Sequence, residues 1–339
     1  MRRQVAEFIA SKRMRGFKNF GRNNSSFYFR VYCLLFILTS LLVDKMAAEG
    51  VPDDFPLLSL STPNILFLCA TLSDHPTLAT VFVASYPKSG TTWMQCIVYN
   101  LLSDGDQSFD HISNYFPFFE ISRTWDQDQG TLHPKYEDRH SSMGSRAFNT
   151  HLRYSMMAQG ERMRYIYVVR RGKDALLSFF HHLAHQDDAD IFNGSLGDFV
   201  RDWCDGKIIF GSWLRHLEGW VMASKEWGGR VLLVRYEDLS SDLSGQMLRI
   251  SQFLGLNHTA ERVSELSALC SFQHMKKCSA QYEPTSVPWR GGFQFLREGR
   301  VGGSASEFSA QDHVIFDDML RRAYPEGLPT WLSDLGVLD

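Results

Sequence analysis

Cysteine is scarce in this sequence and follows no pattern. The 339 residues include six cysteines, and no two of them form a CxxC pair. They are Cys33, Cys69, Cys96, Cys204, Cys270 and Cys278. A disulfide framework needs regularly spaced cysteines, so we expect reduced thiols, as in a reducing compartment. Internal repeats and low-complexity tracts are missing as well, which excludes a solenoid or a repeat array.

An excess of positive charge is also missing from most of the chain. Residues 1–43 carry eight lysines and arginines and one acid, yet the whole chain has a net charge of -3. The remaining residues are therefore acidic overall, and we expect no nucleic-acid partner. The hydrophobic content of 44% and the charged content of 22% are ordinary globular values. A chain of this length can form one large α/β domain or two small ones.

The N-terminal region has an apolar run that is short for a membrane span. Val31–Val43 has thirteen residues behind a basic stretch, whereas a spanning helix needs about 20. Membrane contact is expected only if residues 27–43 act as an anchor. Three interpretations of residues 1–45 stay open: a signal anchor, an organelle transit segment, or sequence that is not part of the working protein. Met46 begins a segment typical of the start of a soluble protein, so we expect a cytoplasmic location, with membrane anchoring or organelle targeting as the alternative.

Residues 81–93, VFVASYPKSGTTW, combine a strand pattern, a tight turn and the start of a helix. Val81–Ala84 is β-branched and aromatic, as in a buried strand, and Pro87 ends it. Lys88–Thr92 is a small turn rich in hydrogen-bond donors, and apolar residues recur with helical spacing from Thr91. Backbone N–H groups, a helix N-terminus and a lysine then converge on one point. The segment therefore predicts a phosphate or sulfate site, although it lacks the GxxxxGK[ST] pattern of nucleoside-triphosphate enzymes.

Apolar segments alternate with helical patterns after this unit. Strands are predicted at 164–170 and 230–236, a strand end at 148–152, and helices at 173–186, 197–204, 208–227 and 239–254. This alternation predicts an α/β fold: a single domain whose central parallel β-sheet is flanked by helices, with a phosphate-binding strand–loop–helix. Residues 103–145 are predicted to be a long irregular segment. We place the domain at 75–330, after a leader (1–45) and a lead-in segment (46–74), with a C-terminal tail at 331–339.

YPKSGTTW resembles the 5′-phosphosulfate loop of the cytosolic-type sulfotransferases, a family with a P-loop-like fold. These enzymes take a sulfonate group from 3′-phosphoadenosine 5′-phosphosulfate (PAPS). The resemblance implies that Lys88 contacts the bridging oxygen and the sulfonate, and that Trp93 stacks on adenine. It also implies a set of residues that hold the 5′-phosphate: Ser89, Gly90, Thr91 and Thr92.

A second block, YVVRRGKDALLSFFHH at 167–182, resembles the family's 3′-phosphate segment. Arg170 ends a predicted strand, and Ser178 follows about two helical turns later, so a guanidinium and a hydroxyl can converge on one phosphate. The resemblance implies that these two residues bind the 3′-phosphate that ATP lacks.

His151 lies in FNTHL, which resembles the family's KTHL segment with its catalytic histidine. Sulfonate transfer to a hydroxyl or an amine needs a base on the acceptor. Neutral imidazole, with a pKa near 6.5, suits that role at neutral pH. The resemblance therefore implies that His151 is the base and Lys88 the second catalytic residue.

Three later blocks complete the resemblance, which covers about residues 80–325 in the family's order. RVLLVRYEDL implies a place for Tyr236 near adenine, and CSFQHM implies that Phe272 and Met275 enclose the base. FLREGRVGG resembles the loop RKGxxG, in which Arg297 and the Gly299 backbone would clamp the 3′-phosphate.

The sequence departs from the family pattern at several positions, among them Gly303, Ser304 and Ala305, which replace the expected Asp-Trp-Lys. Asn149 stands where the family has the lysine of KTH, and Glu298 replaces the lysine of RKG. Loss of one preorganised cationic group commonly slows a reaction by about 10²–10³. A PAPS- or PAP-binding protein with weakened catalysis therefore stays the alternative to a PAPS-dependent sulfotransferase; a nucleotide kinase or NTPase is disfavoured by the position of the lysine. The family's dimer motif is not recognisable in ASEFSAQDHV.

The acceptor is expected to be a small alcohol, phenol or amine of apolar or aromatic character. PFFE at 117–120 resembles an acceptor-pocket segment, which implies substrate contacts by Phe116 and Phe118 together with Asn149 and His151. The HHLAH segment places His181 and His185 one helical turn apart, but no further ligand set accompanies them, so we expect no metal.

Overall fold

The computed structural model describes residues 79–126, 131–157, 159–187, 192–284 and 288–338. The predicted leader (1–45) and lead-in segment (46–74) lie outside these ranges, as does the apolar run at 31–43. Among the residues that are described, no helix has the length and apolar character to cross a membrane.

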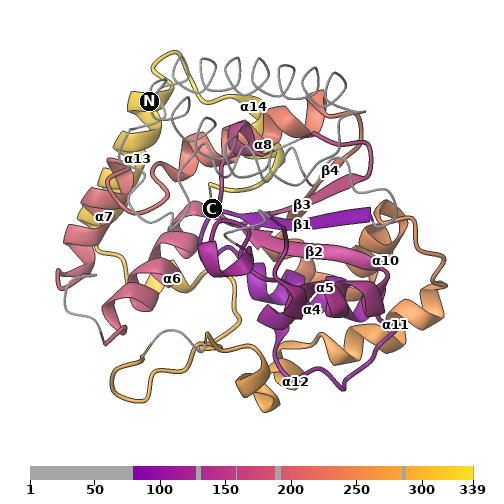
Figure 1. The fold of residues 1–339 in the computed structure, drawn as a ribbon. Helices are drawn as coiled ribbons and strands as arrows, with labels where there is room; N and C mark the ends of the chain where they lie inside the picture. Colours follow the sequence, from indigo (N-terminus) through magenta and orange to yellow (C-terminus); the bar gives the residue numbers. More distant parts are fainter. Residues whose placement is uncertain (1–78, 127–130, 158, 188–191, 285–287, 339) are drawn as a thin grey trace, which may run out of the picture.

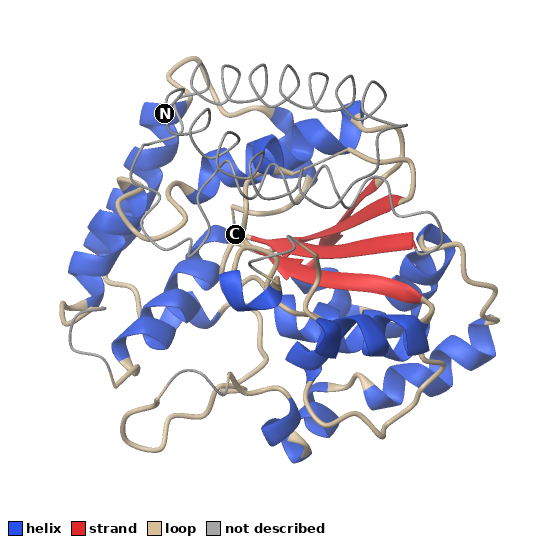
Figure 2. Cartoon of the chain, in the orientation of Figure 1, coloured by secondary structure: helices blue, strands red, loops and turns tan. Residues whose placement is uncertain are grey.

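Within the described residues, four parallel strands form the central sheet, as the alternating sequence pattern predicted (Figure 2). They are β1 (Ala79–Ser85), β2 (Ser145–Thr150), β3 (Met163–Val169) and β4 (Val231–Arg235). Their order is β2-β1-β3-β4, with Phe82 opposite Phe148 on one side and Tyr165 on the other. Because the chain leaves β1 for β2 on one side and later adds β3 on the other, the order reverses at β1. Ligands of open α/β sheets bind at the carboxyl ends of the strands, at such a reversal.

Alternate residues of the strands supply two separate apolar cores, one on each face of the sheet. Phe82, Tyr165 and Tyr167 belong to one cluster, whereas Val83 and Ile166 belong to the other. This two-residue period follows from the pleat of a strand, and both faces are apolar because helices cover both.

The helices divide between these two faces, and Figure 1 shows α8 and α4 on opposite sides of the sheet. The first cluster receives side chains from α6 (Gly172–Ala184), α7 (Leu196–Cys204), α8 (Trp213–Glu226), α13 (Ala310–Ala323) and α14 (Thr330–Asp334). The second receives them from α4 (Thr91–Leu102), α10 (Leu243–Phe253), α11 (Ala260–Leu269) and α12 (Phe272–Lys277).

Two predicted helices have different limits in the structure. The helix predicted at 239–254 is divided into α9 (Tyr236–Ser241) and α10, because Asp242 leaves the helical conformation and its side chain accepts a hydrogen bond from the Gly245 N–H. The helix predicted at 208–227 begins only at Trp213, where Ser212 caps it. Phe210 and Gly211 just before it both have positive φ, which a helix does not allow.

The segment 103–145, predicted to be irregular, contains a helix and ends in a strand. The helix α5 (Pro134–Met143) begins with proline in its first turn and ends at Gly144, which has a left-handed φ of 70°. Strand β2 extends over Ser145–Thr150, beyond the strand end predicted at 148–152, and every residue of it is buried.

Candidate active site

A cavity of about 370 Å³ opens at the carboxyl ends of β1 and β3. Fifteen of the seventeen predicted site residues line it, although they come from segments far apart in the chain. They are Lys88, Gly90, Thr91, Thr92, Trp93, Phe118, Asn149, His151, Arg170, Ser178, Tyr236, Phe272, Met275, Arg297 and Gly299. The sheet and its crossover helices thus gather the predicted blocks around one space.

The loop after β1 fits an anion by its backbone. Gly90 has a φ of 108°, and a Cβ there would lie 2.7 Å from Cδ2 of Tyr236, so only glycine allows this close approach. Helix α4 begins without a side-chain cap, and the N–H groups of its first turn have no partner within a helix. These groups and the positive end of the helix are therefore available to a phosphate.

Ser89 differs from the expectation. It is 1% exposed and does not line the cavity, and its N–H donates to the Tyr86 carbonyl at 3.3 Å. This residue closes the turn, so its backbone donor is already used and its side chain faces the protein.

Lys88 has a fixed backbone and side chain. Its φ is 65°, and its carbonyl accepts a hydrogen bond of 2.8 Å from Arg170. The Nζ lies 3.3 Å from Nδ1 of His182 and 4.2 Å from the centre of the Phe295 ring. Burial, with a further contribution from Arg170, lowers the pKa of Lys88 to about 7. An anion in the cavity would raise that pKa again and favour the ammonium form.

His151 is held in one tautomer. Its Nδ1 lies 2.8 Å from the Ser85 carbonyl oxygen, which can only accept, so Nδ1 carries the proton and Nε2 is the basic atom. Burial is the main cause that lowers the pKa of His151 to about 4, and Lys88 adds to it, whereas the hydrogen bond to Ser85 opposes it. The sequence suggested an ordinary value near 6.5. The imidazole is therefore neutral throughout the physiological range, but it is a weaker base than expected.

One wall of the cavity is aromatic, formed by Trp93, Tyr236 and Phe272, and contacts with neighbouring residues hold these rings in place. Trp93 donates its Nε1–H to the Cys270 carbonyl at 2.7 Å and packs edge-on against Tyr236, with ring centres 5.3 Å apart. The Arg170 guanidinium lies over the Tyr236 ring at 4.4 Å. Gly299 lies so close to the Phe272 ring that a Cβ at this position would overlap it. A flat heteroaromatic base suits such a wall.

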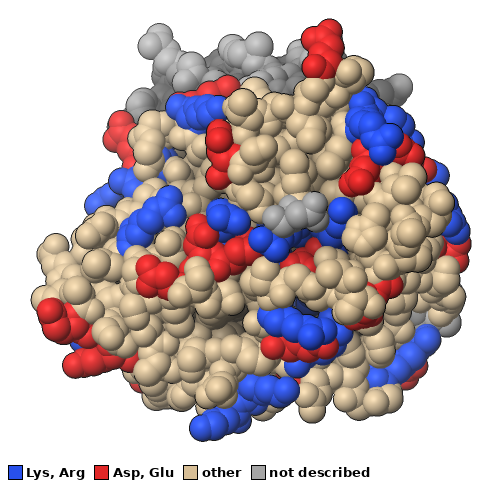
Figure 3. Space-filling model, turned by 180° about the vertical axis from the view of Figure 1, so that it is seen from behind, with Lys and Arg blue, Asp and Glu red and all other residues tan. Residues whose placement is uncertain are grey.

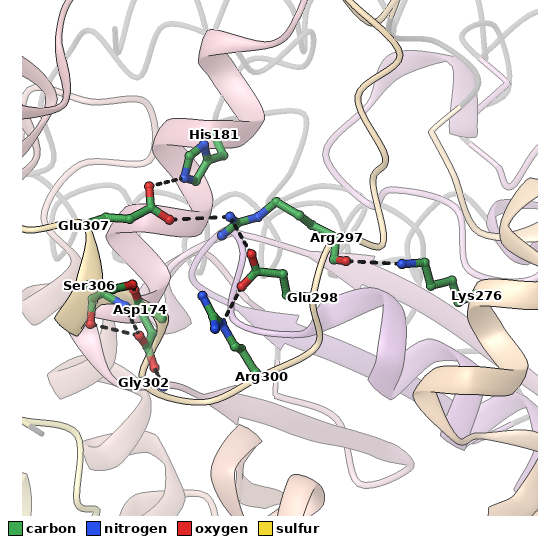
Figure 4. A network of polar contacts seen from close by, with 11 residues as sticks. Asp174, His181, Lys276, Arg297, Glu298, Arg300, Gly302, Ser306 and Glu307 are labelled. Atoms are coloured by element: carbon green, nitrogen blue, oxygen red, sulfur yellow. Dashed lines mark hydrogen bonds and ion pairs between the residues drawn. The ribbon is translucent and has the colours of Figure 1, made fainter.

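The late loop, residues 295–304, is held by ion pairs (Figure 4). Glu298 lies between Arg297, at 3.2 Å, and Arg300. Arg297 also pairs with Glu307 at 3.5 Å, and Glu307 with His181 at 2.8 Å. The charge of Glu298 is thus neutralised by arginines, but it also competes for the arginine that was expected to bind phosphate.

Asp174 anchors the far end of this loop to α6. It accepts hydrogen bonds from the backbone N–H groups of Gly302, at 2.8 Å, and Ser304, at 3.0 Å, and from the Ser304 hydroxyl at 2.9 Å. Burial tends to raise the pKa of Asp174, but these three hydrogen bonds outweigh it and hold the pKa below its usual value. The loop therefore closes over the cavity from a fixed attachment.

The predicted acceptor residues are only partly brought together. The Phe118 ring lies 5.5 Å from the His151 ring and lines the cavity, whereas Phe116 is fully buried in the core behind α4, so its expected substrate contact is wrong. Asn149 lines the cavity, is 5% exposed, and has an Oδ1 without a hydrogen-bond partner among the described residues. The family's lysine charge at this position is absent.

Sequence reasoning missed several side chains at the site. Glu120 lies behind His151 and accepts its backbone N–H at 2.8 Å, and burial raises the pKa of Glu120 to about 7. His216 donates from Nε2 to the His151 carbonyl at 2.9 Å. His182 and Phe295 contact Lys88. Glu120 and His182 lie within quoted motifs, PFFE and FFHH, but only the folded chain shows their contacts.

His181 and His185 of HHLAH are engaged within the protein. His181 bonds to Glu307, and His185 Nδ1 donates to the His181 carbonyl at 2.8 Å. In the described ranges no group of three or more His, Cys, Asp or Glu is arranged to hold a metal ion. The four described cysteines, Cys96, Cys204, Cys270 and Cys278, are free thiols. On the face shown in Figure 3, acidic and basic side chains are interspersed.

Comparison with known proteins matches this chain to one family. The family model of the sulfotransferase domain covers residues 78–329. Human sulfotransferase 2B1 is 29% identical over 296 residues, which are 84% of this chain and 76% of the relative. Mouse sulfotransferase 2B1 is 30% identical over 282 residues, 80% of this chain and 78% of the relative. Luciferin sulfotransferase of Photinus pyralis is 28% identical over 272 residues, 72% and 71% of the two chains.

Solved structures show the same fold. Mouse sulfotransferase SULT7A1 complexed with PAP matches with a TM-score of 0.57 and 22% identity over 77% of this chain and 90% of that one. Retinol dehydratase complexed with androsterone and the inactive cofactor PAP matches with a TM-score of 0.60 and 20% identity, over 78% and 86%. From the family model and the curated relatives, we conclude that this chain belongs to the sulfotransferase domain family.

Proposed function

We propose that this protein transfers the sulfonate group of PAPS to a hydroxyl or amine of a small acceptor. One observation carries the proposal: Lys88 and His151, the two predicted catalytic residues, line one cavity, and His151 is locked in the tautomer that a base needs. PAPS supplies, when bound, a sulfonate on a phosphosulfate linkage whose cleavage leaves 3′-phosphoadenosine 5′-phosphate (PAP).

The donor would be held by groups that the fold preorganises. The first turn of α4 offers its N–H groups to the 5′-phosphate. Arg170 directly follows β3 and Ser178 lies within the next helix, α6; both would bind the 3′-phosphate, with Arg297 closing from the late loop. Trp93, Tyr236, Phe272 and Met275 would enclose adenine.

The chemical step would use three of the chain's own groups. Nε2 of His151 takes the proton from the acceptor hydroxyl or amine, and the resulting imidazolium is stabilised because Nδ1–H already donates to Ser85. The Lys88 ammonium stabilises the charge that develops on the departing phosphate. Asn149 offers a side-chain amide where the resemblance leads one to expect a second cation.

The acceptor would enter beside Phe118 and Ile121, which line the cavity next to His151. These apolar side chains favour an apolar or aromatic alcohol, phenol or amine. Retinol and androsterone are bound by structural neighbours of this fold, which agrees with that class without identifying the acceptor.

The second candidate is a protein that binds PAPS or PAP with weakened catalysis. Two observations favour it: Asn149 supplies no charge, and Glu298 engages Arg297 and Arg300. In this case the donor site would be retained and the chemical step would be slow.

Two measurements separate these functions. Calorimetric titration should show PAP binding at least tenfold tighter than ADP, because Arg170, Ser178 and Arg297 meet a phosphate that ADP lacks. Equal affinities would overturn both candidates. Transfer of labelled sulfate to a panel of phenols, sterols and amines then separates enzyme from binder. In His151→Ala, transfer should be lost while PAP binding is retained.

A further inference from the structure

His182 has a direct contact with Lys88 that no predicted role accounts for. Its Nδ1 lies 3.3 Å from Nζ of Lys88, and the side chain lines the cavity. Residue 182 lies on α6 one turn beyond Ser178, so both side chains occupy the same face of that helix. The contact therefore joins the loop after β1 to the helix that follows β3.

The protonation of the pair is set by chemistry. A lysine ammonium can only donate hydrogen bonds, so Nδ1 of His182 must accept, and the proton of the neutral ring lies on Nε2. Burial first, and then Lys88 and His151, lower the pKa of His182 to about 2. His182 therefore stays a neutral acceptor at any physiological pH. One of the three ammonium N–H groups is directed at Nδ1, and two are left for an anion.

The surrounding packing fixes His182 in turn. Its ring lies edge-on to Trp289, with centres 5.1 Å apart, and 6.1 Å from the Phe295 ring. Phe295 also lies under the Lys88 ammonium at 4.2 Å. Lysine has four rotatable side-chain bonds and a high rotamer entropy, so these contacts restrict a group that would otherwise sample many positions.

We propose that His182 is a positioning residue that holds the Lys88 ammonium through Nδ1 in the orientation needed for the donor. This rests on the proposed function of the site. A fixed ammonium acts without reorganisation at the moment of transfer, and preorganisation is the main source of electrostatic catalysis. A fixed Lys88 ammonium matters more in this cavity because Asn149 contributes no positive charge to it.

The groups around Lys88 make its ionisation a direct measure of this contact. Arg170 and His151 interact electrostatically with it, His182 accepts from it, and Phe295 is apolar. Among these groups His182 offers a hydrogen-bond acceptor to the charged form without repelling it. Loss of that acceptor should therefore lower the Lys88 pKa further.

The first test measures Lys88 in the protein without nucleotide. The pH dependence of amine acylation, followed by peptide mass spectrometry, should give a midpoint near pH 7 for Lys88. His182→Leu should lower this midpoint by about one pH unit, since a hydrogen bond to a charged group is of that order. His182→Asn keeps an acceptor at the position of Nδ1 and should restore the wild-type midpoint. Equal midpoints in all three proteins, each folded by circular dichroism, would overturn the proposal.

The second test measures turnover and donor binding separately. His182→Leu should lower kcat about tenfold and leave the Kd of PAP within about threefold, because PAP lacks the sulfonate; His182→Asn should recover most of kcat. The alkaline limb of kcat/KM, which reports the free enzyme, should move to lower pH in the leucine variant alone. A fall in PAP affinity equal to the fall in kcat would contradict a positioning role. If the wild type itself transfers no sulfonate, the proposed function fails, while the acylation result still decides the Lys88–His182 contact.

Discussion

The two loops that face the cavity with positive charge are constructed in opposite ways. The loop after β1 is formed by backbone: a strand, a turn with Lys88 and Gly90 at positive φ, and an uncapped helix N-terminus. The late loop has little regular structure and is held by side chains, with Glu298 and Glu307 on Arg297 and Asp174 on its far end.

The difference indicates how each loop responds to change. Backbone donors are fixed by the sheet and do not depend on the charge of their neighbours, so the first loop is available to an anion as it stands. Arginines paired with carboxylates must exchange those partners for phosphate, so the late loop binds at a cost that salt and substitution can alter. We expect catalysis to depend on the first loop and donor affinity to be adjustable through the second.

The largest effect is expected at the one full charge of the first loop. Lys88→Met should lower kcat/KM for sulfonate transfer by about 10²–10³, the usual value of a preorganised cationic group. PAP affinity should change by less than about tenfold, because PAP has no sulfonate. Lys225→Met, at an exposed position on α8, is the matched control and should transfer at the wild-type rate. A Lys88→Met enzyme within a factor of three of the wild type would contradict the central role of this loop.

The next largest effect is expected from a change in the backbone of the first loop, at Gly90. In Gly90→Ala, the new Cβ would lie 2.7 Å from Tyr236, at a φ of 108°. Tyr236 or the loop must shift, and PAP affinity should fall at least tenfold by calorimetry. Gly255→Ala is the control: residue 255 also has a positive φ, 73°, but nothing lies within 4 Å of the position of its Cβ. It should lose some thermal stability and keep its PAP affinity. Equal losses of affinity would show that the close approach at Gly90 is not required.

The contrast between the loops also explains what the sequence could predict. Strand β1 begins and ends within two residues of its predicted limits, and helix α4 begins at the predicted Thr91, because a β-branched run and a helical period are local signals. Helix α5 was missed: its sequence, PKYEDRHSSM, has no apolar stripe, and it is specified by proline in the first turn and a His133 cap instead. Strand β2 was only partly found because Arg146 and Asn149 interrupt its apolar pattern.

The same distinction applies to the site. Arg170 and His151 directly follow strands and Lys88 lies in the turn after β1, so a motif read along the chain finds them. The contact of His182 with Lys88 joins residues 94 positions apart, and the burial that lowers the pKa of His151 depends on the whole fold. Phe116 shows the reverse error. Phe116 precedes the acceptor-like motif, just after the short helical turn Ile112–Asn114 to which its N–H is bonded, and this turn directs its side chain into the core.

A change at Asp174, which attaches the late loop to α6, should have a moderate effect on stability and on PAP affinity. Asp174→Asn keeps the shape but turns one acceptor atom into a donor facing the Gly302 or Ser304 N–H. The free energy of unfolding should fall by about 1–3 kcal/mol, as for a buried donor left unsatisfied, and PAP affinity should fall several-fold. Asp312→Asn, which removes a comparable carboxylate from the cap of α13, should lose similar stability with no change in PAP affinity. Unchanged affinity in Asp174→Asn would mean that the late loop does not need its anchor.

The smallest effect on PAP affinity is expected from a change at Glu298, whose carboxylate pairs with Arg297 and Arg300 of the late loop. In Glu298→Gln, Arg297 and Arg300 lose a charged partner and become available to phosphate, so PAP should bind about two- to fivefold more tightly in low salt. The gain should shrink as ionic strength rises, because the ion pairs are partly exposed and screened. Glu326→Gln removes the same charge from an exposed position outside the cavity and controls for net charge. Weaker PAP binding in Glu298→Gln would show instead that Glu298 orients the arginines for phosphate. The late loop would then be as preorganised as the loop after β1.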